Sequence, residues 1–162
     1  MLLLTGPPAA GKNTIAFHLA RSCARCAVVD VDLVRAMLVQ PHHAPWQGEE
    51  GQRQQRLGID LACQLAAGFA ADGCAVIILD VLSPETTARY HDRLAPFTPT
   101  IVQLLPSREE CCRRFLARGP SLTDDEFALL YGEQAAFVDY HARFDNTHLS
   151  VAEAAALLQG FL

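Results

Sequence analysis

Short apolar runs alternate with longer segments of helical pattern along the whole chain. Runs at residues 2–4, 27–29, 75–79 and 100–105 are mostly apolar, without the polar residue at every second position that marks a half-exposed strand. Strands of this kind are typical of a parallel sheet that helices cover on both faces. The pattern therefore predicts an α/β fold, with about five parallel strands in three layers.

The same periodicity gives the expected elements. We expect strands at 2–4, 27–29, 75–79 and 100–105 and near His148, and helices at 14–22, 33–39, 49–71, 84–94, 108–117, 124–140 and 151–158. Ser150 and Glu153 have the spacing of a capping box for the last helix. The 162 residues show no long linker, so we expect one domain over residues 1–162.

Composition excludes several classes of protein. Hydrophobic residues make up 51% and charged residues 19%, which is not the composition of a disordered chain. The net charge of −5 disfavours nucleic acid and membrane surfaces as partners. No apolar run reaches membrane-spanning length, and residues 1–5 are too short for a signal peptide, so a cytoplasmic location is expected. Cys23 and Cys26 lack a second ligand pair, which indicates reduced thiols rather than a zinc site.

A glycine-containing string, G-P-P-A-A-G-K-N-T, follows the first expected strand and opens the first expected helix. It matches G-x-x-x-x-G-K, in which backbone N–H groups and a helix N-terminus surround phosphate oxygens. Lys12 is the only lysine, and it stands where a mobile positive charge would reach the β- and γ-phosphates. The predicted nucleotide-binding residues are Gly6, Pro7, Ala9, Ala10, Gly11, Lys12, Asn13 and Thr14.

The residue after the lysine departs from this pattern. A Ser or Thr is expected there as a Mg²⁺ ligand, but the chain has Asn13, and Thr14 comes next. Asn13 takes the place of that ligand and is kept as a candidate metal contact. The string G-P-P-x-x-G-K-x-T resembles the loop of adenylate kinase and related nucleoside monophosphate kinases, which also have the threonine one step later.

Carboxylates follow the second and third expected strands. Asp80 ends the apolar run 76–79, as in a Walker-B pattern, and is a candidate Mg²⁺ ligand. Asp30 and Asp32 follow the second strand; one could accept a hydroxyl proton and the other could organise the metal. The D-x-D string resembles shikimate kinase, and D-x-x-R resembles the 5′-hydroxyl site of polynucleotide kinase. Both resemblances imply that Asp32 is the base, Asp30 a metal-side carboxylate and Arg35 an acceptor-binding residue. Each aspartate could instead cap a helix or turn.

Arginines cluster on the expected helix 108–117 and at its end. Arg114 and Arg118 are four residues apart and share a face, with Gly119 and Pro120 beyond them. This resembles the lid, here about residues 114–124, whose R-x-x-x-R pair closes over ATP in the shikimate, gluconate and polynucleotide kinase group. The alternative is a solvated face paired with nearby glutamates. The resemblance also implies that Asn146 and Thr147 contact adenine, although a plain turn uses the same residues.

The segment between the second and third strands, about residues 35–58, is the expected acceptor-binding region. Trp46, the only tryptophan, could stack on an acceptor or pack its loop onto the following helix. Arg53 and Arg56 could bind an anionic acceptor group, or pair with Glu49 or Glu50 on the surface.

Over nearly its whole length the chain resembles a small P-loop kinase, of the group that contains shikimate kinase, polynucleotide kinase and chloramphenicol phosphotransferase. The resemblance implies the P-loop NTPase fold, ATP and Mg²⁺ as cofactors, and transfer of the γ-phosphate to a hydroxyl of a small molecule. Three alternatives stay open: a nucleoside monophosphate kinase, favoured by the K-x-T loop; a polynucleotide 5′-hydroxyl kinase; and a regulatory module that only binds nucleotide.

Overall fold

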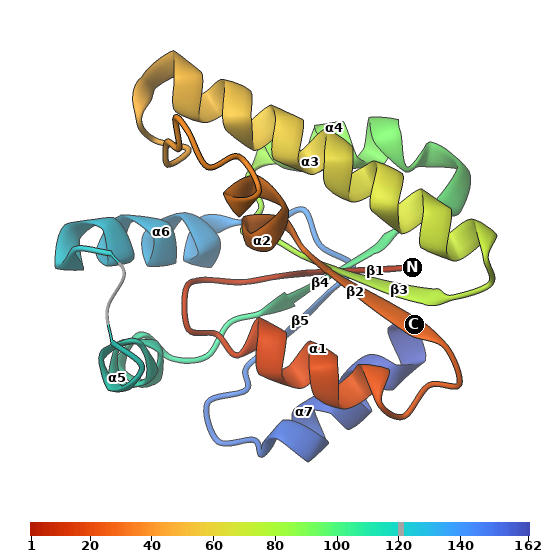
Figure 1. Ribbon diagram of the computed structural model, residues 1–162. Helices are drawn as coiled ribbons and strands as arrows, with labels where there is room; N and C mark the ends of the chain where they lie inside the picture. The colour runs from red at the N-terminus through yellow and green to blue at the C-terminus, as the bar shows by residue number, and fades with distance from the viewer. Residues whose placement is uncertain (120–121) are drawn as a thin grey trace.

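The computed structural model describes residues 1–119 and 122–162 and contains one five-stranded sheet (Figure 1). The strands are β1 (Leu2–Thr5), β2 (Cys26–Asp30), β3 (Ala75–Leu79), β4 (Thr100–Leu104) and β5 (Ala142–Phe144). They lie in the order β2-β3-β1-β4-β5, and every neighbouring pair is parallel. The predicted α/β class and parallel sheet are confirmed.

Helices cover both faces of this sheet (Figure 1). They are α1 (Lys12–Ala20), α2 (Val31–Ala36), α3 (Gly48–Ala71), α4 (Pro84–Arg93), α5 (Arg108–Ala117), α6 (Asp124–Ala136) and α7 (Val151–Leu158), with 3₁₀ turns at Ala95–Phe97 and Gln159–Phe161. Helices α1 and α7 lie on one face, and α2, α3 and α4 lie on the other. Helices α5 and α6 lie beside the loop into which β1 leads.

Strand β1 divides its side chains between two cores, because successive residues of a strand point to opposite faces. Leu3 belongs to the core under α3 and α4, together with Ile59 and Tyr90. Leu2 and Leu4 belong to the core under α1 and α7. All five side chains are fully buried, and each such burial stabilises the fold by about 1.5–3 kcal/mol. The sheet is thus held from both sides, and its strand ends form a fixed platform.

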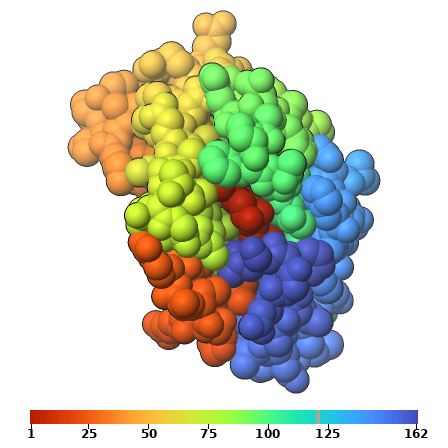
Figure 2. Space-filling view, turned by 90° about the vertical axis from the view of Figure 1, so that its right-hand side faces the viewer, coloured from red at the N-terminus to blue at the C-terminus, as the bar shows by residue number. Residues whose placement is uncertain are grey.

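The opposite edge of the sheet, where the strands begin, is closed by the ends of neighbouring elements. Figure 2 shows the start of the chain recessed among the segments that carry α3, α4 and α7. Within the described residues, no helix is both long and apolar enough to cross a membrane.

One region near the C-terminus differs from the prediction. The expected helix 124–140 ends at Ala136, because Phe137 takes an extended backbone (φ −65°, ψ 133°). The last strand is Ala142–Phe144 rather than a strand near His148. Its sequence, A-R-F, lacks the apolar run that marked the other strands, and its three side chains are only half-buried. His148 instead follows a turn in which Asp145 accepts the Thr147 N–H at 2.8 Å.

Other boundaries shift by a few residues. Helix α2 begins at Val31 and ends at Ala36 rather than spanning 33–39, because Asp30 is its N-cap. Helix α1 covers Lys12–Ala20 instead of 14–22. The predicted capping box of Ser150 and Glu153 is confirmed.

Candidate active site

A cavity of about 1050 Å³ lies at the carboxyl ends of the central strands. Its walls come from the segments after β1, β2 and β3, from the loop before α3, and from α3, α5 and α6. β1 lies between β3 and β4, so the crossovers leave in opposite directions at this point, where parallel sheets bind ligands. This volume lies at the upper end of the ~300–1,000 Å³ of ordinary ligand pockets.

The loop between β1 and α1 requires glycine at its first position. A Cβ on Gly6 would lie 2.2 Å from the Leu104 carbonyl oxygen, so any side chain would push the loop away from β4. Gly11 has φ 95° and is the N-cap of α1, and Ala9 has φ 62°. The string thus folds into the tight strand–loop–helix turn predicted for a phosphate-binding loop.

Lys12 extends back along this loop. Its ammonium donates to the carbonyl oxygens of Gly6 at 2.6 Å and Pro7 at 3.1 Å. Burial lowers the pKa of Lys12 to about 8, against the opposing attraction of Asp32 and Asp80. The only lysine of the chain is therefore a positive charge held at the centre of the loop.

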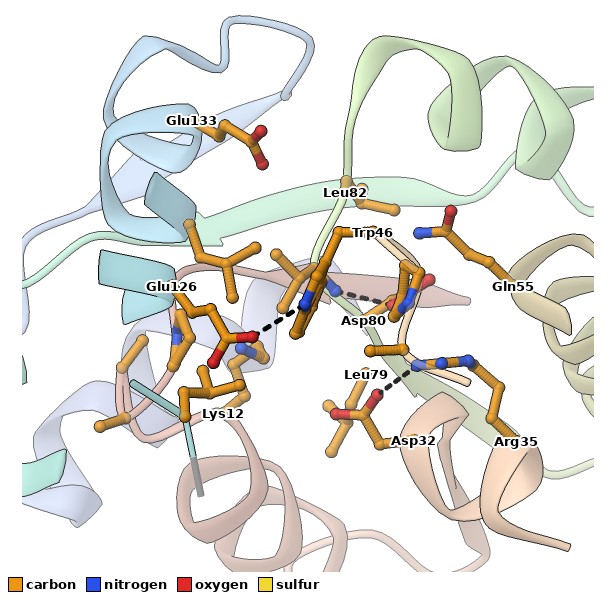
Figure 3. Close-up of a pocket in the computed structure, with 18 of the residues that line it drawn as sticks. Lys12, Asp32, Arg35, Trp46, Gln55, Leu79, Asp80, Leu82, Glu126 and Glu133 are labelled. Atoms are coloured by element: carbon orange, nitrogen blue, oxygen red, sulfur yellow. Dashed lines mark hydrogen bonds and ion pairs between the residues drawn. The ribbon is translucent and has the colours of Figure 1, made fainter. Parts of the chain in front are cut away.

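Asp80 lies across the floor of the cavity from Lys12 (Figure 3). Its carboxylate accepts the Val81 N–H at 2.8 Å and the hydroxyl of Tyr90 at 2.7 Å. Burial raises the pKa of Asp80 to about 6. Tyr90, fully buried on α4, is a partner that sequence reasoning missed; the two residues are ten apart and no local motif links them.

The raised pKa of Asp80 predicts a pH-dependent effect of Asp80→Asn. Between about pH 4 and 6 the folded state holds a proton that the unfolded state has lost, so this group lowers stability as pH rises through that window. Above about pH 6 the folded state bears the full free-energy cost of burying the ionised Asp80 carboxylate. The neutral amide of Asp80→Asn removes that cost. We expect the variant's Tm, relative to the parent, to rise by several degrees between pH 4 and pH 7.5 in thermal unfolding. Asp92→Asn on the exposed side of α4 is the matched control, and an equal gain at both pH values would contradict the prediction.

Asp30 acts as a helix cap. Its carboxylate accepts the Asp32 N–H at 3.0 Å as the N-cap of α2, and it also accepts the side-chain amide of Asn13. Asp30 and Asn13 line the cavity, as predicted, but they are paired with each other. Among the residues the structure describes, no three His, Cys, Asp or Glu side chains form a metal-binding group. Metal contacts by Asp30, Asp80 and Asn13 stay predictions.

Asp32 presents a far more open carboxylate. Its side chain is 79% exposed and touches one group, the Arg35 guanidinium, at 3.3 Å (Figure 3). Arg35 is only 11% exposed, and its other arm donates to the His43 carbonyl oxygen at 3.1 Å. A Cβ on Gly58 would lie 2.3 Å from the Arg35 Cγ, so the missing side chain gives the arginine its place against α3. Arg35 is thus fixed, and Asp32 faces the cavity.

The two predicted lid arginines have different surroundings. Arg114 donates to the Ala10 carbonyl oxygen at 3.4 Å and the Asn146 carbonyl oxygen at 3.1 Å, and pairs with Glu110 at 2.6 Å. Arg118 lies 5.9 Å from the Phe115 ring centroid and lines the cavity. Arg114 therefore braces the phosphate loop. Within the predicted lid of residues 114–124, Pro120 and Ser121 lie outside the described residues.

Asn146 and Thr147 hold the loops together from the outside. The Asn146 side chain is buried and donates to the Ala10 carbonyl oxygen at 2.9 Å. Thr147 accepts the Ser107 N–H at 2.7 Å and bonds Asp145. Neither is among the described residues that line the cavity, and their contact with adenine stays a prediction. Their positions support the phosphate loop.

Trp46 lines the cavity and reaches across its mouth. Its indole N–H donates to a Glu126 carboxylate oxygen at 2.9 Å, which joins the loop before α3 to α6 (Figure 3). A Cβ on Gly51 would lie 2.0 Å from the Ala44 carbonyl oxygen, so this loop rests directly on α3. Glu126 also accepts the Thr123 N–H at 2.8 Å as part of the α6 capping box. The T-x-x-E spacing could have predicted that cap, but not the contact with Trp46.

Arg53 and Arg56 do not take part in the cavity. Arg53 pairs with Glu50 at 2.6 Å and lowers the pKa of that carboxyl to about 2, while Arg56 lies 3.9 Å from Glu85. Neither lines the cavity in the described part of the chain. Arg53 thus forms the surface pair named as the alternative, and the acceptor-binding role of both arginines stays a prediction.

This arrangement predicts that Arg53→Gln leaves the site unaffected. An exposed ion pair contributes about 0.2–1 kcal/mol, so we expect a small loss of stability and less than a twofold change in acceptor KM. Steady-state kinetics with an acceptor of the protein would measure the change. Arg56→Gln is the companion variant. A tenfold rise in acceptor KM for either variant would show that the substituted arginine contributes to acceptor binding.

Comparisons with known proteins bear on the fold. No family model and no curated protein matches the chain. Among solved structures, a sugar kinase from Janibacter sp. superposes with a TM-score of 0.74 at 14% identity, covering 99% of this chain and 92% of that one. The tunicamycin resistance protein of Deinococcus radiodurans gives 0.72 at 13%, covering 98% and 92%. Shikimate kinase from Acinetobacter baumannii, in complex with shikimate, gives 0.66 at 21%, covering 98% and 90%.

These likenesses define a class. The chain has the P-loop kinase-like α/β fold that shikimate kinases and a sugar kinase share. The resemblance predicted from the phosphate loop and the strand-end carboxylates is confirmed at the level of the fold.

Proposed function

We propose that the protein is an ATP-dependent phosphotransferase that moves the γ-phosphate of ATP to a hydroxyl of a small molecule. The proposal rests on one juxtaposition. Lys12, which follows β1, and the open carboxylate of Asp32, which follows β2, line the same cavity beyond the carboxyl ends of the two strands that flank β3. A phosphate-binding cation and a proton acceptor at one cavity are what transfer to a hydroxyl needs.

The phosphate loop fits the nucleotide. Its tight backbone and the N-terminus of α1 suit the phosphates, and Lys12 now bonds two loop carbonyls that the phosphates would replace. Arg118, which lines the cavity from the end of α5, would stabilise charge on the transferring group. Arg114 donates to the Ala10 carbonyl oxygen and would help to position the phosphate loop around the phosphates.

Asp32 suits the role of base better than Asp30. Asp30 already accepts two hydrogen bonds, from the Asp32 N–H and from Asn13. Asp32 has one ion-pair contact with Arg35, which orients the carboxylate toward the cavity. In the proposed step the acceptor oxygen forms a bond to the γ-phosphorus, the bond to the ADP oxygen breaks, and Asp32 takes the hydroxyl proton.

A divalent cation would neutralise charge on the phosphates. Asp80 and, once released from Asn13, Asp30 are the carboxylates that would hold Mg²⁺, directly or through water. Thr14 lines the cavity at the next position of α1 and offers a hydroxyl.

A nucleoside monophosphate kinase is the rival reading. Such an enzyme needs cations for the acceptor phosphate and no base, yet the predicted cations Arg53 and Arg56 pair with surface glutamates. A polynucleotide acceptor is disfavoured by the net charge of −5. A regulatory module would bind ATP without turnover.

The test is ATP consumption by the purified protein with Mg²⁺, against separate pools of sugars, nucleosides, nucleoside monophosphates and 5′-hydroxyl oligonucleotides. Turnover with hydroxyl acceptors of low mass is expected. Turnover confined to nucleoside monophosphates or oligonucleotides would move the function to the corresponding rival. Tight ATP binding with no turnover in any pool would favour the regulatory module.

A further inference from the structure

The cavity has one wall without strong cations. We call it the acceptor wall: the cavity-lining residues of the loop 42–47, of α3, of the start of α4 and of α6. Its polar members include Gln52 and Gln55 on α3, Glu85 on α4, and Glu126 and Glu133 on α6. Within the described residues, the lining of this wall contains three glutamates and neither lysine nor arginine, and one of the three, Glu85, lies 3.9 Å from Arg56 outside the lining.

The cations of the cavity are committed elsewhere. Lys12 bonds the phosphate loop, and Arg114 braces that loop through Ala10. Arg118 belongs to the predicted lid and lies over the Phe115 ring, and Arg35 is held between Asp32 and the His43 carbonyl oxygen. At the acceptor wall, a carboxylate or phosphate would therefore meet glutamates and no guanidinium of the lining. The guanidinium beside Asp32, that of Arg35, already pairs with Asp32 and the His43 carbonyl oxygen.

Helix α6 arranges two of these carboxylates on one face. Glu126 and Glu133 are seven residues apart, which is two turns or about 10 Å along the axis, with Leu129 and Leu130 between them in the lining. Figure 3 shows the Glu133 carboxylate pointing from α6 into the cavity, on the side opposite Gln55. Within the described residues Glu133 makes no hydrogen bond or ion pair, so its charge is available to a ligand.

Trp46 completes the wall. It is 43% exposed and fixed by its hydrogen bond to Glu126, so its ring is held at the cavity rather than packed away. An indole face beside carboxylates suits a cation, since the ring's negative face attracts positive charge by about 0.5–2 kcal/mol. An uncharged acceptor would stack on the Trp46 ring but would not gain this electrostatic attraction.

We infer that the acceptor is a cationic alcohol: a polyol, such as an amino sugar or aminocyclitol, that carries an ammonium group. The ammonium binds Glu133, with Glu126 and Trp46 beside it, while a hydroxyl of the same molecule reaches Asp32. The amine stays protonated and has no free electron pair, so phosphate goes to the hydroxyl oxygen and the hydroxyl proton goes to Asp32. This inference rests on the proposed function and names its acceptor class.

Matched acceptors test it. Glucosamine, glucose and glucuronate present an ammonium, a neutral hydroxyl and a carboxylate on one ring, and pools of amino sugars with aminocyclitols, neutral polyols and sugar acids widen the comparison. With ATP and Mg²⁺, we expect the ammonium compounds to give at least a tenfold higher kcat/KM than neutral ones, and the acids to give none. Equal turnover of neutral compounds, or preferred turnover of acids, would overturn the inference while leaving the phosphotransferase intact.

Glu133→Gln separates binding from chemistry. It should raise KM for ammonium acceptors about 5- to 10-fold, change kcat less than twofold, and leave neutral acceptors unaffected, as expected for a lost charge-assisted contact. Glu133→Lys should reverse the preference toward acids. Glu49→Gln, on the exposed first turn of α3 and outside the cavity, is the matched control. An unchanged KM for ammonium acceptors in Glu133→Gln would show that Glu133 does not bind the ammonium group.

A binding measurement keeps the inference independent of turnover. Because Trp46 is the only tryptophan, its fluorescence reports on the acceptor wall alone. If no pool is phosphorylated, the proposed function fails, and fluorescence titrations with the same ammonium and neutral pools still decide the inference. Saturable quenching by ammonium compounds that Glu133→Gln weakens would support it; no quenching, or equal quenching by neutral compounds, would overturn it.

Discussion

Lys12→Met is expected to raise the Kd for ATP by at least about 100-fold, or about 3 kcal/mol, and to reduce phosphotransfer to background. The variant removes the only lysine, whose ammonium lies against two carbonyls of the phosphate loop. Titration calorimetry with ATP in the presence of Mg²⁺ measures the loss. Removing a charge whose burial already lowers its pKa to about 8 should not destabilise the fold, so the Tm is expected to stay within a few degrees.

Two further measurements sharpen this prediction. Arg21→Met removes an exposed cation from the C-terminal end of the same helix and should leave ATP affinity unchanged. In the parent protein, ATP affinity should fall as pH rises above about 8, because the free Lys12 loses its proton there and ATP must restore it. A Lys12→Met protein that binds ATP as well as the parent would show that the loop is not the phosphate site.

Asp32→Asn is expected to lower kcat by about 10²- to 10⁴-fold while leaving the Kd for ATP within twofold. The amide keeps the shape of the side chain and can still accept a bond from Arg35, but it cannot take the hydroxyl proton. Steady-state kinetics and ATP calorimetry on the same preparation separate the two effects.

Asp30→Asn is the matched control for that variant. Asn is as good an N-cap as Asp, so α2 should keep its start. The contact with Asn13 changes, and the proposed Mg²⁺ contact loses its charge, but the proposed base Asp32 is left in place. We expect a much smaller loss of kcat than in Asp32→Asn. The reverse order would assign the base to Asp30, and an Asp32→Asn protein with full turnover would remove Asp32 from the chemistry.

Much of the fold could be predicted from local patterns. The string at residues 6–14 forms a strand–loop–helix turn, in which only glycine fits at position 6 against Leu104. The apolar run 75–79 forms strand β3 with the predicted bounds. The last strand could not be predicted in the same way. Ala142–Phe144 is short, half-buried and carries an arginine, so only its pairing with β4 makes it a strand.

The site was predictable in its residue types and not in its contacts. Lys12, Asp32 and Asp80 follow from motif spacing, and all line the cavity. The bonds from Tyr90 to Asp80 and from Trp46 to Glu126 join elements far apart in the chain, and no local periodicity encodes them. The surface pair of Arg53 and Glu50 also depends on rotamers that a sequence does not reveal.

The contact of Asn146 with Ala10 sets an order of events during synthesis. The phosphate loop is made before the residues that bond its Ala10 carbonyl, because Arg114 and Asn146 come 104 and 136 positions later in the chain. A growing chain that has released only its N-terminal half has the G-x-x-x-x-G-K string without these two braces. The loop therefore gains both braces only after Asn146 has left the ribosome, and until then its Ala10 carbonyl lacks these two partners.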